Sequence, residues 1–193
     1  RKFNFLIENE NNSYHRKIFS TKSKKIQSGG LFFAIILTMS TLEQNLYITI
    51  SLILMFFLGM LSDINLISSP KIRFFFQIFI IVFLIISTNT FVEQTRIIFL
   101  DHLIQNIIFS FFFTIFCFLI LINGCNFIDG VNTSLIGYFL IVSLNLFYLE
   151  FVGVKISQII DFYYLITVLI ALFIFNFFNK LYLGDGGSYF LGF

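Results

Sequence analysis

The stretch LIQNIIFSFFFTIFCFLILI, residues Leu103–Ile122, decides the fold of this chain. It contains no charged residue, and as a helix it is long enough to cross the roughly 30 Å of hydrocarbon in a lipid bilayer. Its apolar residues are continuous rather than alternating, which is not the pattern of a strand in a membrane barrel. The stretch therefore predicts a helix that spans a membrane.

Similar uncharged stretches recur along the 193-residue chain. Hydrophobic residues make up 58% of the sequence, charged residues 11%, and the mean hydropathy is +0.94, which leaves too little polar surface for a soluble domain. We expect an all-α, polytopic membrane helix bundle with about six transmembrane helices, forming a single integral membrane domain over residues 1–193. The other five stretches are Ser28–Leu42, Asn45–Leu61, Phe74–Val92, Ser134–Leu149 and Phe162–Phe178.

Both ends of the chain suggest a fragment that lacks its first and last transmembrane helices. The sequence starts at Arg1, and a further apolar run begins near Tyr189. Residues 1–27 are polar and basic, so they do not resemble a cleavable signal peptide. We expect them to form a basic cytoplasmic loop.

The distribution of lysine and arginine predicts the orientation of the helices. Of the 12 basic residues, 10 fall in the first segment, the loop after the second span and the loop after the sixth span. Only Arg96 and Lys155 fall on the opposite side. Because cytoplasmic loops carry the excess of positive charge, the richer face is predicted to be cytoplasmic.

Three aspartates are predicted to share that face. Asp63, Asp129 and Asp185 each lie in a short polar segment, and two predicted spans separate each from the next. An even number of crossings returns the chain to the same side of the membrane. We therefore expect the three carboxylates to meet at the cytoplasmic surface, where such a cluster indicates chemistry.

The segments around the second and third aspartates are unusually polar for positions beside lipid. Asn126 and Asp129 are three residues apart and share one face of a helical turn. In Gly184–Ser188, glycines allow backbone amides to approach an anion, and Asp185 could hold a divalent cation there. An ordinary tight turn at Gly184–Ser188, and an ordinary solvated charge at Asp63, remain open alternatives.

Taken together, these motifs resemble the polyprenyl-phosphate N-acetylhexosamine-1-phosphate transferases. This family includes bacterial enzymes that start O-antigen, enterobacterial common antigen and teichoic acid synthesis, and phospho-N-acetylmuramoyl-pentapeptide transferase. The third and fourth motifs are the specific ones. The four matching stretches are Arg16-Lys17 with Gly29-Gly30, Gly59…Asp63…Lys71…Gln77, Asn123…Asn126…Asp129-Gly130, and Gly184-Asp185…Gly187-Ser188.

The resemblance implies a membrane enzyme that uses Mg²⁺. It would transfer N-acetylhexosamine-1-phosphate from a UDP-sugar to undecaprenyl or another polyprenyl phosphate and release UMP, the initiating step of cell-surface polysaccharide synthesis. The active site would lie on the cytoplasmic face of the bacterial inner membrane, and a homodimer is possible. Nothing in the sequence indicates nucleic-acid binding.

The resemblance also implies roles for individual residues. Asp63, Asp129 and Asp185 would be catalytic, and Asp185 would bind the magnesium ion. The residues implied in substrate binding are Asn126, Asn132, Tyr182, Lys17 and Lys71, with Tyr182 suited to stacking on uracil.

The chain departs from the family pattern beside Asp63. Ser62 stands where the family has the first acid of an Asp-Asp pair. The segment Ile64-Asn65-Leu66 lacks the lysine that is usual in the muramoyl-pentapeptide branch, which favours a simple UDP-N-acetylhexosamine donor. Two alternatives remain: a phospho-N-acetylmuramoyl-pentapeptide transferase, or a non-catalytic relative or transporter that only binds lipid phosphate.

Overall fold

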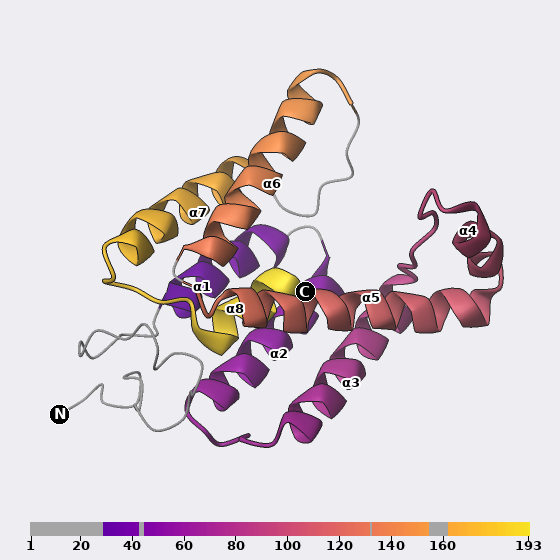
Figure 1. Cartoon of the computed structure of the whole chain (residues 1–193), viewed down its shortest axis with the longest axis horizontal. Coiled ribbons are helices and arrows are strands. Elements are labelled where there is room, and N and C mark those ends of the chain that lie inside the picture. Colours follow the sequence, from indigo (N-terminus) through magenta and orange to yellow (C-terminus); the bar gives the residue numbers. More distant parts are fainter. Residues whose placement is uncertain (1–28, 43–44, 132, 155–161) are drawn as a thin grey trace.

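The computed structural model describes residues 29–42, 45–131, 133–154 and 162–193, shown as ribbon in Figure 1. Lys17 and Asn132, two of the predicted substrate-binding residues, lie outside the described residues. Within them every regular element is a helix. The predicted all-α class is therefore confirmed.

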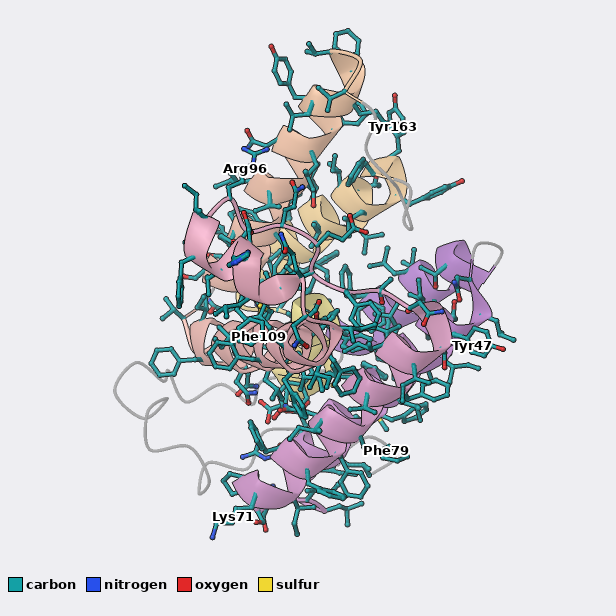
Figure 2. The ribbon with its side chains drawn as sticks, turned by 90° about the vertical axis from the view of Figure 1, so that its right-hand side faces the viewer. Tyr47, Lys71, Phe79, Arg96, Phe109 and Tyr163 are labelled. Atoms are coloured by element: carbon teal, nitrogen blue, oxygen red, sulfur yellow. The ribbon has the colours of Figure 1, made fainter. Side chains whose placement is uncertain are left out.

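Six apolar helices correspond to the six predicted spans. Four of them, α2, α3, α5 and α6, are long and apolar enough to cross a membrane, and α1 and α7 are shorter apolar helices. Large side chains such as Phe79 and Tyr163 point outward, 62% and 69% exposed, as expected where lipid covers the surface (Figure 2). The six helices are α1 (Gly29–Leu42), α2 (Leu46–Asp63), α3 (Pro70–Thr88), α5 (Ile107–Ile128), α6 (Ser134–Phe151) and α7 (Phe162–Phe177).

The stretch Leu103–Ile122 does not form one helix from end to end. A short helix, α4 (Ile98–Ile104), ends inside it, and Asn106 then caps α5 by accepting hydrogen bonds from the N–H groups of Ile108 and Phe109 at 2.9 and 3.4 Å. Helix α5 continues to Ile128, six residues beyond Ile122. Asn123 and Asn126 are therefore helical residues and not part of a loop.

The last helix, α8 (Gly184–Gly192), lies at the centre of the molecule, where α1, α2 and α5 contact it (Figure 1). It begins at Gly184, five residues before the apolar run that the sequence indicates. Glycines make the close packing possible: a Cβ atom on Gly30 would lie 2.7 Å from the backbone nitrogen of Gly187. Most residues of α8 are buried, including Ser188 and Tyr189.

The segments that carry the predicted site meet at one end of the bundle, as the crossing count requires. The N–H group of Gly29, at the start of α1, donates to the carbonyl oxygen of Tyr182 just before α8, at 3.0 Å. At the opposite end, the hydroxyl of Thr49 donates to that of Thr41 at 3.0 Å and joins α2 to α1. Hydrogen bonds of Asp63, Arg73 and Asn126 with residues of the first turn of α8 gather the polar segments at the first of these ends.

The connection between α3 and α5 is ordered by an aspartate in the short helix α4. Oδ1 of Asp101 accepts hydrogen bonds from the backbone N–H of Thr95 at 2.6 Å and from its hydroxyl at 2.7 Å. These bonds, the backbone bond first, hold the pKa of Asp101 below its ordinary value of 3.8.

This geometry predicts a pH-dependent connection. Because the pKa of Asp101 is lowered by folding, its contribution is present above pH 3.8 and is lost as the pH falls through the lower folded value. We expect Asp101→Asn to increase hydrogen exchange of the segment around Thr95 at pH 7, measured by mass spectrometry. Equal exchange in the variant and the native protein at that pH would contradict this role.

Candidate active site at one end of the bundle

Asp185 is the centre of the polar cluster at this end of the bundle. It is the second residue of α8, and its side chain is 18% exposed. Oδ1 accepts a hydrogen bond from Nδ2 of Asn126 on α5 at 2.8 Å. Oδ2 accepts one from the hydroxyl of Ser62 on α2 at 2.7 Å and one from Arg73 on α3 at 3.3 Å. Four helices thus position one carboxylate.

Asp63 contacts the backbone around Asp185. It is the last residue of α2. Oδ1 accepts from the N–H of Asp185 at 2.9 Å, and Oδ2 accepts from the N–H of Gly186 at 3.1 Å. Two of the three predicted aspartates therefore do come together.

Arg73 is the residue that sequence reasoning did not select. Its guanidinium donates to the hydroxyl of Ser62 at 2.7 Å and to Asp185, and it lies 3.5 Å from the hydroxyl oxygen of Tyr189. Arg73 therefore places a guanidinium beside the carboxylate of Asp185. The signal in the sequence was spacing, because Arg73 and Gln77 are four apart and share a face of α3.

Gln77 extends the cluster into the bundle. It is completely buried, and its Oε1 accepts a hydrogen bond from Nδ2 of Asn123 on α5 at 3.0 Å. Nε2 of Gln77 and Nε of Arg73 are both buried and have no acceptor among the described residues. The polar face of α3 therefore continues from Arg73 to Gln77, one helical turn further into the bundle than the aspartates.

Asn126, and not Asp129, is the α5 residue that contacts Asp185. Asn126 also donates to the hydroxyl of Ser188 at 3.1 Å. Asp129 lies one turn further on, at the C-terminal cap of α5, where its N–H donates to the carbonyl oxygen of Cys125 at 3.0 Å. Among the described residues there is no group of three acids, histidines or cysteines close enough to hold a metal ion. Of the three aspartates, Asp63 and Asp185 are therefore in contact, and the α5 residue that bonds to the Asp185 carboxylate is Asn126.

Two further predicted residues lie near the cluster without a described bond to Asp185. Tyr182 precedes α8, and its hydroxyl donates to Oδ1 of Asn179 at 2.6 Å. Lys71 is exposed in the first turn of α3 and lies at the tip of that helix (Figure 2). Within the described part of the chain, the cation that reaches Asp185 is Arg73, two residues later.

The approach to α8 is supported by Asn176, a second residue that the sequence analysis did not select. It is 3% exposed. Its Oδ1 accepts from the N–H of Thr133 at 2.7 Å, and its Nδ2 donates to the carbonyl oxygen of Leu181 at 2.9 Å. Asn176 therefore joins the end of α7 to the start of α6 and to the segment before α8. Asn176 is the single carboxamide in an otherwise apolar helix. That isolated polar residue was the signal in the sequence that could have identified it.

Fold and site together define a class: a multi-pass membrane protein with carboxylates, a carboxamide and a guanidinium at one end of its helix bundle. The chain belongs to glycosyl transferase family 4, whose model matches residues 45–193. It is therefore a glycosyl-phosphate transferase of the kind that transfers a sugar phosphate to a polyprenyl phosphate. Searches of curated proteins and of solved structures gave no significant match.

Proposed function

We propose that this protein transfers N-acetylhexosamine-1-phosphate from a UDP-sugar to undecaprenyl phosphate and releases UMP, as the first step in making a bacterial surface polysaccharide. The observation that carries the proposal is the placement of Asp185 between Asn126, Ser62 and Arg73 at one end of a membrane bundle of this family. The excess of positive charge in the flanking segments supports a cytoplasmic position for this end, in the bacterial inner membrane.

The proposed reaction is a phosphoryl transfer that needs no redox partner. An oxygen of the lipid phosphate attacks the β-phosphorus of the UDP-sugar. A new P–O bond forms, the bond from that phosphorus to the UMP oxygen breaks, and UMP leaves with the bonding electrons. Catalysis of such a step depends mainly on positioning and on electrostatic stabilisation of the phosphate oxygens. Arg73 supplies a fixed positive charge within the cluster for this purpose.

The donor set around Asp185 fits a magnesium ion that is held largely by substrate. Mg²⁺ usually binds one or two protein carboxylates and completes its shell with phosphates and water. The carboxylate of Asp185 has about four acceptor sites, and the three bonds from Asn126, Ser62 and Arg73 leave room on Oδ1. Asp185 would hold the ion, which when bound neutralises charge on the diphosphate.

The remaining predicted residues keep their proposed roles. Asp129 and Asn126 would contact the nucleotide-sugar, with Asn132 beside them, and Tyr182 would stack on uracil. Lys17 and Lys71 would contact phosphate, with Lys71 placed to attract the polyanionic donor to the surface. The long chain of the acceptor stays in the bilayer, and only its phosphate needs to reach the end of the bundle.

The direct test uses the full-length protein in liposomes that contain undecaprenyl phosphate. We expect UDP-N-acetylglucosamine or a related UDP-N-acetylhexosamine to give UMP and a lipid-linked sugar diphosphate in equal amounts, and only when Mg²⁺ is present. UDP-N-acetylmuramoyl-pentapeptide in the same assay tests the alternative donor. Binding of the UDP-sugar without UMP release would contradict the proposal and favour a non-catalytic relative, for which Ser62 in place of an acid is the supporting observation.

A further inference from the structure

We propose that Asp63 is a positioning residue that caps the N-terminus of α8, and that it is neither the catalytic base nor a metal ligand. The inference rests on the proposed transferase function and specifies which of its aspartates reacts. In this proposal the carboxylate that takes part in the reaction is that of Asp185, and Asp63 holds Asp185 in place.

The first observation is that the Asp63 carboxylate binds the start of α8 with both of its oxygens. The first N–H groups of a helix have no partner within the helix, and this end carries a partial positive charge. Leu183, which stands at the N-cap of α8, makes no side-chain capping bond. Asp63 supplies the cap from a different helix, through bonds of 2.9 and 3.1 Å to the N–H groups of Asp185 and Gly186.

The second observation is that the surrounding backbone is shaped around this cap. Gly184 has φ +72°, and a Cβ atom on it would lie 2.7 Å from Oδ2 of Asp63. Gly59 is one turn before Asp63 on the same face of α2, and a Cβ atom there would overlap the carbonyl oxygen of Asp185 and lie 2.6 Å from Cα of Gly186. The absence of both Cβ atoms lets α2 reach the first turn of α8.

The cap changes what the glycine-rich segment can do. The sequence predicted that its backbone amides would approach an anion, and two of them do so, but the anion is the carboxylate of Asp63. Those amides are therefore not available to a substrate phosphate. Phosphate recognition then falls to side chains, and among the described residues Arg73 supplies a charged donor beside Asp185.

The same cap explains how Asp185 keeps its orientation. Asp185 is fixed at its backbone by Asp63 and at its side chain by Asn126, Ser62 and Arg73. Removal of the cap frees the first turn of α8 and lets the carboxylate move, although Asp63 itself touches no substrate. A displacement of about 1 Å is enough to reduce a rate by about 100-fold.

Two substitutions separate the positioning role from a catalytic one. Asp63→Ala removes both acceptors, whereas Asp63→Asn keeps one oxygen in the same place and remains a competent helix cap. In the full-length protein we expect Asp63→Asn to retain UMP release within about tenfold of the native rate, and Asp63→Ala to lose about 100-fold or more. A catalytic base would be inactivated equally by both changes, because neither variant can accept the proton.

Two further readouts make the test decisive. With Asp63→Asn, the acidic limb of the pH profile of kcat/KM should remain, since in this proposal Asp63 does not titrate during the reaction. The Mg²⁺ concentration needed for half-maximal rate should rise in Asp63→Ala only, because Asp185 is then misaligned. Loss of the acidic limb in Asp63→Asn, or equal inactivation of both variants, would overturn the proposal.

Hydrogen exchange tests the cap without any turnover. The peptide that covers residues 182–193 should exchange about tenfold faster in Asp63→Ala than in the native protein. Asp101→Ala, which removes a hydrogen-bonded aspartate in the connection between α3 and α5, is the control and should leave this peptide and the rate unchanged. If exchange changes as expected but neither the native protein nor any variant releases UMP, the capping role of Asp63 is supported and the proposed transferase function is contradicted. Unchanged exchange in a folded Asp63→Ala protein would refute the cap itself.

Discussion

Asp185→Asn should reduce UMP release by about 10²- to 10³-fold. The change preserves the size of the side chain and one acceptor oxygen, but it removes the negative charge that pairs with Arg73 at 3.3 Å and that would hold magnesium. Turnover of UDP-N-acetylhexosamine on undecaprenyl phosphate, measured across a range of Mg²⁺ concentrations, provides the readout.

The matched control is Glu150→Gln, which neutralises an exposed acid at the end of α6 away from the site. We expect it to keep the native rate, because an exposed charge in a high-dielectric surrounding contributes little. Full activity in the Asp185→Asn variant would remove Asp185 from the mechanism and with it the central observation of the proposal.

Gly59→Ala should strongly destabilise the protein and abolish activity. The new methyl group would overlap the carbonyl oxygen of Asp185 and lie 2.6 Å from Cα of Gly186, and both neighbours are backbone atoms that cannot rotate away. Helices α2 and α8 would have to separate, at a cost of about 1–3 kcal/mol or more. The thermal unfolding midpoint in detergent and the rate of UMP release should both fall.

The chain contains a matched control for this change. Gly124 also lies inside a membrane helix, but a Cβ atom placed on it meets no side chain and no backbone of another segment within 4 Å among the described residues. Gly124→Ala should therefore be neutral or slightly stabilising, by up to about 1 kcal/mol, because alanine favours a helix more than glycine does. Equal loss of stability in the two variants would show that the close packing of α2 on α8 is not the cause.

The helices and their order were predictable because the residues of each membrane-spanning helix must suit the lipid that surrounds it. A helix in lipid is apolar along most of its length, so each of α1, α2, α3, α5, α6 and α7 overlaps one of the uncharged stretches of the sequence. The division between α4 and α5 was missed, because Gln105 and Asn106 are uncharged and only their capping bonds end one helix and start the next. The start of α8 was missed as well, because its first turn is rich in glycine, and a glycine-rich segment is typical of a loop.

The candidate site was predicted in part. The sequence identified Asp63, Asn126 and Asp185, and the structure brings these three together. It did not identify Arg73, because a cation in a juxtamembrane segment looks like one that only sets topology. Asp129 was expected in the same cluster; the α5 residue that bonds to Asp185 is Asn126, one turn earlier in the chain.

The sequence by itself determined that this chain is a membrane helix bundle and that its polar segments share one face, because hydropathy and crossing number are properties of the chain alone. Only the tertiary structure decided what each aspartate does. A carboxylate acquires its role from the donors that surround it: Asp63 meets two backbone N–H groups of α8, whereas Asp185 meets a hydroxyl, a carboxamide and a guanidinium from three other helices. Those donors lie up to 123 positions away along the chain, and only the packing of the helices brings them together.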